Sequence, residues 1–189
     1  MPYGSRRREG SGTGTDVVRS RHEKPRATIV TRLTNPYIGL DGYNCFGCAP
    51  TNTAGLKLEF YLDGESVVAI WHPDRRFVGY GNIVHGGIQA TLLDEVGAWA
   101  VNVLVRTAGV TRRMTTEYRT PVYADRGPVK ISASIDGADG KVARVSARIL
   151  DADGAPCVEA GIEYALFSES LARKRLNYPG YEAFLPGRA

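Results

Sequence analysis

Cysteine and histidine are scarce in this chain, and long apolar runs are missing from it. The 189 residues include three cysteines and three histidines. An odd number of cysteines does not form a disulfide framework, so a reducing, cytoplasmic location is expected. No run of 18 apolar residues is present, so no membrane span and no membrane partner are predicted. The N-terminus is basic but lacks an apolar segment, so no secretory signal is predicted.

Excess charge is missing from most of the chain. The net charge is +4, and residues 1–30 alone hold seven basic and three acidic side chains. The rest is therefore formally neutral, so no basic face for nucleic acid is predicted. Residues 1–30 also contain few apolar groups, which is typical of a flexible arm. We predict a basic N-terminal arm over residues 1–33, one domain over 34–170 and a C-terminal tail over 171–189.

Alternating apolar and polar residues predict strands on both sides of one long helix. Residues 56–62 alternate, and residues 65–72 are the expected partner strand after Asp63-Gly64, a favoured two-residue hairpin turn. Residues 85–106 are apolar nearly all round until Thr107 and Gly109, which predicts a helix buried on more than one side. Further strands are expected over 111–123, 129–135, 143–149 and 158–166, and residues 27–33 form either a short strand or part of the arm.

Successive hairpins make the predicted sheet mostly antiparallel. A single sheet can bury such a helix only by curling around it, which predicts an α+β architecture. A curled sheet leaves an open edge and an uncovered apolar flank, so a homodimer is expected.

The predicted helix carries a candidate site for acyl chemistry. Gly86 and Gly87 lack side chains, so a carbonyl can approach their N–H groups, at a helix end that favours negative charge. Asp94 lies seven residues after Gly87, on the same helix face, and a carboxylate in an apolar helix is costly unless it is used. About 10 Å of helix separates them, too far for one reacting carbon to touch both. Two copies of the helix, from two subunits, are therefore expected to complete each site.

These residues resemble those of hotdog-fold acyl-CoA thioesterases, in particular the PaaI-like branch related to 4-hydroxybenzoyl-CoA thioesterases. The resemblance rests on His85-Gly86-Gly87, on Asp94 nine residues after the histidine and on Gly97, and it extends to the lead-in at residues 44–56. It implies a curved antiparallel sheet around one long helix and hydrolysis of acyl-CoA to a free acid and CoA. It implies no cofactor, and homodimers or dimers of dimers with composite sites. The alternative is a hotdog protein that binds acyl-CoA without hydrolysing it.

The resemblance also implies residue roles. Gly86 binds the oxyanion, and Asp94 acts either as general base or as nucleophile. Three roles are open for His85, namely orienting the loop, binding the thioester oxygen through its ring and capping the helix, and the resemblance implies a supporting role rather than a nucleophilic one. Thr111 hydrogen-bonds the attacking water, unless it is only a threonine at a strand start.

Three residues are candidates for substrate binding: Gly87, Asn82 and Glu95. Asn82 is the weakest of them, because relatives carry an asparagine six residues before the histidine and this chain has Gly79 there. Glu95 is a rival acid about 100° further round the helix, where a salt bridge at a dimer seam is expected.

Cys45-x-x-Cys48 is compatible with a metal or redox site. Structural zinc requires four ligands, and neither Cys157 nor His72 has ligand spacing to this pair. We therefore expect no metal, and two cysteines that pack in the lead-in. The sequence leaves the acyl chain and the choice between dimer and tetramer open.

Overall fold

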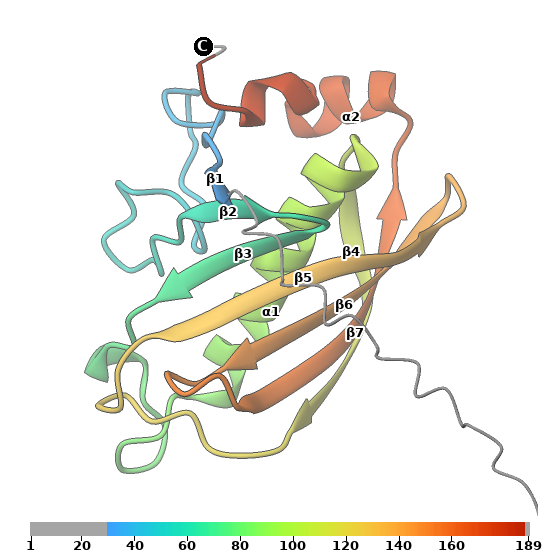
Figure 1. Ribbon diagram of the computed structural model, residues 1–189. Helices are drawn as coiled ribbons and strands as arrows, with labels where there is room; N and C mark the ends of the chain where they lie inside the picture. Colours follow the sequence, from blue (N-terminus) through green and yellow to red (C-terminus); the bar gives the residue numbers. More distant parts are fainter. Residues whose placement is uncertain (1–29, 188–189) are drawn as a thin grey trace, which may run out of the picture.

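A single antiparallel sheet wraps around one central helix in the computed structural model, which describes residues 30–187 (Figure 1). The sheet has the order β1-β2-β3-β5-β6-β7-β4, and all neighbouring strands are antiparallel. This confirms the predicted α+β fold and the curled sheet. The strands are β1 (Val30–Arg32), β2 (Phe60–Asp63), β3 (Ser66–Trp71), β4 (Gly109–Tyr118), β5 (Val129–Ala138), β6 (Val142–Leu150) and β7 (Pro156–Leu166).

The central helix α1 (Gly86–Ala100) lies in the concave side of the sheet. It continues as one π-helical segment, η2 (Val101–Val105), and stops at Arg106, which adopts the left-handed conformation with φ of 61°. The predicted helix is thus confirmed, together with its end before Thr107. Residues 86–105 are apolar enough to cross a membrane by length and composition. Because half of this stretch is buried in the protein, packing against the sheet accounts for its apolar character.

The hairpin before the helix lies one residue away from its predicted position. Asp63 pairs with Ser66, so the turn consists of Gly64 and Glu65, with Gly64 at φ of 60°. Asp63 remains in the sheet, where its carboxylate lies 3.3 Å from the Lys130 ammonium.

The first half of the predicted strand 56–62 is a loop. Lys57 has a left-handed φ of 55°, which interrupts an extended chain. The N–H groups of Leu56 and Leu58 donate instead to the carbonyl groups of Phe46 and Gly47, at 2.8 and 2.9 Å. This loop attaches the lead-in to the domain.

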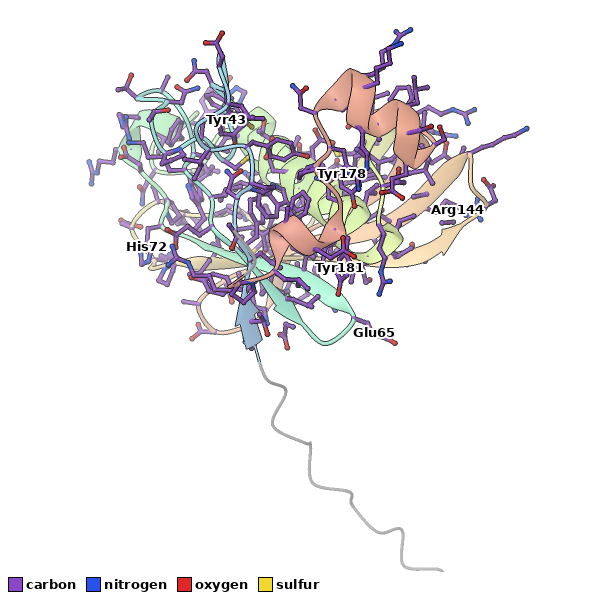
Figure 2. The ribbon with its side chains drawn as sticks, turned by 90° about the horizontal axis from the view of Figure 1, so that it is seen from above. Tyr43, Glu65, His72, Arg144, Tyr178 and Tyr181 are labelled. Carbon is purple, nitrogen blue, oxygen red and sulfur yellow. The ribbon has the colours of Figure 1, made fainter. Side chains whose placement is uncertain are left out.

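Both ends of the described chain join the core. Strand β1 pairs with β2, which confirms a strand for the described part of residues 27–33, while residues 1–29 of the predicted arm lie outside the described residues. At the other end, α2 (Glu169–Leu176) and the 3₁₀ segment η3 (Tyr181–Phe184) cover one end of the helix (Figures 1 and 2). The buried Tyr178 hydroxyl donates to the carbonyl of Asn102 at 3.0 Å. A second 3₁₀ segment, η1 (Arg75–Phe77), precedes α1.

Candidate active site

The carboxylate of Asp94 is held by two hydroxyl groups from two strands that follow it in the sequence. Thr111 Oγ1, near the start of β4, donates to Asp94 Oδ1 at 2.7 Å. Tyr164 Oη, on β7, lies 3.1 Å from the same Oδ1 and 2.8 Å from the Asp94 carbonyl oxygen. Within residues 30–187, Asp94 Oδ2 accepts no hydrogen bond. The carboxylate is therefore oriented through one oxygen while the other stays free for chemistry.

Tyr164 is a site residue that the sequence reasoning missed as such. The alternation of β7 turns it inward, where it is 1% exposed. Burial, and then the nearby Asp94 carboxylate, raises the pKa of Tyr164 above its usual range, so the phenol stays a donor. Gly97 makes this contact possible, because a Cβ there would lie 2.5 Å from Tyr164 Oη. A glycine inside an apolar helix, facing an inward tyrosine, was the available signal.

His85 caps the start of α1. Its Nδ1 accepts a hydrogen bond from the Gly87 N–H at 2.9 Å. A neutral imidazole that accepts at Nδ1 carries its proton at Nε2. The capping role, one of those considered for His85, is thus present in the structure.

The two glycines after His85 differ in hydrogen bonding. The Gly87 N–H is engaged by His85, whereas the Gly86 N–H has no partner within the described part of the chain. A cavity of about 360 Å³ opens at this helix start and is lined by Gly86, His85, Gln89 and Tyr118, among others. Of the two predicted donors, Gly86 is the one available to a ligand.

Tyr118 and Gln89 also belong to this cavity, and the sequence reasoning missed both. Tyr118 Oη donates to the Gly86 carbonyl at 2.9 Å, and its ring lies against Gly86. Gln89 is 4% exposed and donates through Nε2 to the Val84 carbonyl at 2.6 Å. These bonds fix the backbone on both sides of His85.

Asn82 does not line this cavity. Its side chain is half-buried, and its carbonyl accepts the N–H of Ala124 at 2.9 Å. Gly79 does lie there, and a Cβ at this position would be 3.4 Å from the His85 ring. The position where relatives carry an asparagine therefore faces the histidine, and this chain leaves it without a side chain.

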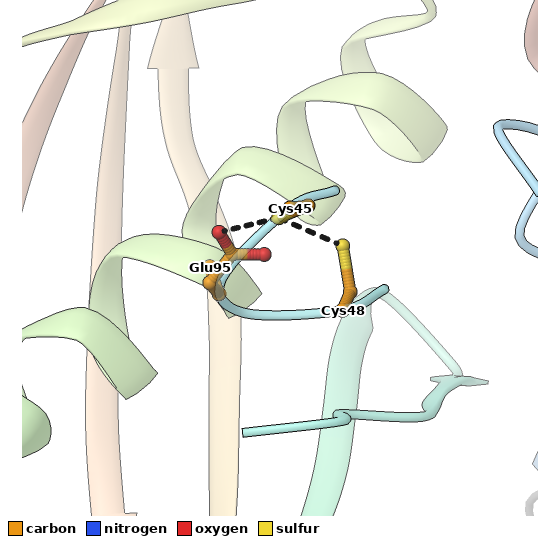
Figure 3. A group of neighbouring side chains, drawn as sticks. All are labelled: Cys45, Cys48 and Glu95. Atoms are coloured by element: carbon orange, nitrogen blue, oxygen red, sulfur yellow. Dashed lines mark hydrogen bonds between the residues drawn. The ribbon is translucent and has the colours of Figure 1, made fainter. Parts of the chain in front are cut away.

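Glu95 turns away from Asp94 and into a cluster with Cys45 and Cys48 (Figure 3). Cys45 Sγ lies 3.4 Å from Glu95 Oε1 and 3.3 Å from Cys48 Sγ. Glu95 makes no salt bridge within residues 30–187, and the bridge expected for it at a dimer seam, which needs a second subunit, stays a prediction.

The close approach of these three groups shifts their pKa values. Burial, and then the adjacent Cys45, raises the pKa of Glu95 to about 8. The hydrogen bond from the Cys48 thiol lowers the pKa of Cys45 to about 5. The same contact and burial raise the pKa of Cys48. Of the three groups, Cys45 is the one whose negative charge is favoured by its neighbours.

Comparison with known proteins finds similarity to one family and to one yeast protein. Residues 81–158 match the family model described as the Thioesterase superfamily. An uncharacterized protein of Schizosaccharomyces pombe is 29% identical over 123 residues, which cover 63% of this chain and 70% of the yeast protein.

Solved structures show the same fold. The crystal structure of a thioesterase superfamily protein aligns with a TM-score of 0.59 and 25% identity over 64% of this chain and 59% of that protein, so this chain spans less than two thirds of it. A thioesterase from Haemophilus influenzae has a TM-score of 0.58 at 16% identity, covering 64% of this chain and 85% of its own. A hypothetical thioesterase from Streptococcus pneumoniae, crystallised with coenzyme A, has a TM-score of 0.53 at 18% identity. The alignment covers 56% of this chain and 80% of that protein. The chain is thus a hotdog-fold protein whose residues 81–158 match the thioesterase superfamily.

Proposed function

We propose that this protein hydrolyses an acyl-CoA thioester to a free acid and CoA. The observation that carries the proposal is the Asp94 carboxylate on the central helix, held through Oδ1 by Thr111 and Tyr164 and left free at Oδ2. A carboxylate that is oriented in this way is suited to act as a base or as a nucleophile. The PaaI-like branch is the part of the superfamily that the residues around Asp94 favour.

In the general-base form of the reaction, Asp94 Oδ2 takes a proton from water as the water oxygen bonds to the thioester carbonyl carbon. The carbonyl oxygen becomes an oxyanion, which the free N–H of Gly86 stabilises at the positive end of α1. The C–S bond then breaks, and the proton on Asp94 passes to the departing CoA sulfur. In the nucleophilic form, Oδ2 itself bonds to the thioester carbonyl carbon, and the C–S bond breaks to release the CoA thiolate. Water then hydrolyses the resulting anhydride, which frees the acid, restores the Asp94 carboxylate and supplies the proton that the thiolate takes up.

A homodimer with composite sites is part of the proposal. The cavity at the start of α1 is lined by Gly86 but not by Asp94, as the helical spacing between them requires. Within the described residues, β4 pairs only with β7, so its other edge is free over ten residues. Thr111 and Tyr118 both lie on this edge strand, so pairing through β4 places the two halves of each site beside the seam.

The ligand follows from the superfamily and from one solved relative. The Streptococcus pneumoniae protein was crystallised with coenzyme A, which supports CoA as the carrier group here. No membrane or nucleic-acid partner is proposed, and the cytoplasmic location remains a prediction.

A panel of acyl-CoA substrates, assayed with a thiol reagent for free CoA, tests the proposal. We expect turnover with at least one acyl group, and loss of nearly all of it in Asp94→Asn at unchanged circular dichroism. Saturable acyl-CoA binding without thiol release across the panel would instead favour the non-hydrolytic alternative. Full activity in Asp94→Asn would exclude the proposed mechanism.

A further inference from the structure

The cluster of Cys45, Cys48 and Glu95 lies outside the proposed catalytic groups and brings together three metal-ligating side chains. Their donor atoms all lie within 4.8 Å of one another (Figure 3). Two come from the lead-in loop, and the third comes from the middle of α1, fifty residues away in sequence. Within residues 30–187, neither Cys157 nor His72 joins the group.

We propose that Cys45, Cys48 and Glu95 bind one Zn²⁺ ion, which ties the lead-in loop to the central helix. Zinc is four-coordinate, with bonds of about 2.3 Å to sulfur and 2.0 Å to oxygen. A tetrahedron with these bonds separates sulfur from oxygen by about 3.5 Å and two sulfurs by about 3.8 Å. The distance from Cys45 Sγ to Glu95 Oε1 is 3.4 Å, and the two sulfurs, now 3.3 Å apart, need to separate by about half an ångström.

A fourth ligand can come from solvent. All three side chains line a cavity of about 350 Å³, which gives water access to the cluster. Three protein ligands and one water are the arrangement of zinc sites that keep an open position, so the four-ligand rule for closed structural zinc does not apply to this cluster. Tyr43 Oη lies 3.2 Å from Cys48 Sγ and accepts a hydrogen bond from Asn35 Nδ2, so its own proton can support the Cys48 thiolate.

The chemistry of the donors selects the metal. Two thiolates favour Zn²⁺ or Cu(I) over Mg²⁺ and Ca²⁺, and a carboxylate as third ligand favours Zn²⁺ over Cu(I). Within the described chain, no Lys or Arg side chain forms a salt bridge with Glu95, so no basic side chain there already neutralises this carboxylate. The local backbone also fits the role, because a Cβ at Gly47 would overlap the Glu95 carboxylate.

The test uses the full chain, reduced and stripped of metal, and Co²⁺ as a spectroscopic substitute for zinc. We expect thiolate-to-cobalt absorption that saturates at one equivalent and is displaced by Zn²⁺. Cys45→Ser and Cys48→Ser should remove this absorption, and Cys157→Ser, a buried cysteine outside the cluster, should keep it. Glu95→Gln should weaken Zn²⁺ binding by more than about 100-fold in a chelator competition, because outer partners of zinc ligands alone account for 10- to 100-fold.

Three outcomes would overturn the zinc site. One is that reduced wild-type protein binds neither Co²⁺ nor Zn²⁺. This holds also where Cys45 and Cys48 form a disulfide once the same protein is exposed to air. Another is absorption that depends equally on Cys157. The third is unchanged zinc affinity in Glu95→Gln. Because each variant is read by metal binding, with folding checked by circular dichroism, the result does not depend on whether the protein hydrolyses acyl-CoA.

Discussion

Replacing Tyr164 by phenylalanine tests whether Asp94 is held for catalysis. The substitution removes one oxygen from a side chain that is 1% exposed, and with it the contacts to the Asp94 carboxylate at 3.1 Å and carbonyl at 2.8 Å. Hydrogen bonds to charged groups contribute about 1.5–3 kcal/mol, so the free energy of unfolding should fall by about that amount. The ring still fills its place, so little is lost to a cavity.

The expected effect on activity follows from what remains at the carboxylate. Thr111 still donates to Oδ1 at 2.7 Å, so Asp94 keeps one of its two anchors and samples more orientations. If about 1.4 kcal/mol of this positioning is lost in the transition state, kcat falls about tenfold. Because Tyr164 acts through Asp94 rather than on the substrate, the loss should appear in kcat, with KM little changed.

Tyr178→Phe is the matched control for this experiment. Tyr178 is also 1% exposed and donates to a carbonyl of the same continuous helix, at Asn102. The Tyr178→Phe variant should lose about 0.5–1.5 kcal/mol of unfolding free energy, because the hydrogen bond that it lacks is a neutral one. Its kcat should equal that of the wild type. Urea unfolding and thiol release are measured on both variants. Equal kcat in the two would show that Tyr164 supports only the fold, and the argument about positioning would be refuted.

Two further substitutions examine the glycines of the helix. In Gly86→Ala the new Cβ lies 3.6 Å from the Tyr118 ring, an ordinary contact, so Tm should be unchanged. The substrate carbonyl no longer reaches the Gly86 N–H, so kcat/KM should fall about 10²-fold. Unchanged thiol release would show that Gly86 is not part of the oxyanion site. In Gly97→Ala the Cβ lies 2.5 Å from Tyr164 Oη, and the overlap should cost about 1–3 kcal/mol in urea unfolding as well as activity. A Gly97→Ala variant as stable and active as wild type would mean that Tyr164 does not need to reach Asp94.

The helix and most strands were predictable because each is encoded by local periodicity. Residues 85–106 are apolar nearly all round, and the strands alternate with period two, so their existence and type followed from the sequence alone. The predicted hairpin turn was wrong by one residue. Turn chemistry places Gly64 in the turn but does not determine whether Asp63 or Glu65 is the other turn residue. The loop at residues 56–59 was also missed, because alternating leucines do not reveal the left-handed φ of Lys57.

The contacts within the site were less predictable because they join distant segments. Thr111 is 17 residues from Asp94, and the resemblance to thioesterases named it as a partner of the attacking water, whereas in the structure it donates to Asp94. Tyr164 is 70 residues away, and Cys45 is 50 residues from Glu95. The positions of Thr111 and Tyr164 depend on β7 lying between β6 and β4, a strand order that local hairpins do not determine.

The adjacent carboxylates of α1 show how one helix supports two kinds of site. Asp94 and Glu95 point about 100° apart around the helix axis. In the surroundings of each carboxylate, one glycine leaves space that a side chain would fill. Gly97 leaves room for the tyrosine that holds Asp94, and Gly47 leaves room for Glu95 among the cysteines. Asp94 receives donors and keeps one oxygen free, whereas Glu95 faces thiols and has its pKa raised to about 8. Neighbouring acids with such different surroundings have different chemistry, which is why we assign hydrolysis to one and metal binding to the other.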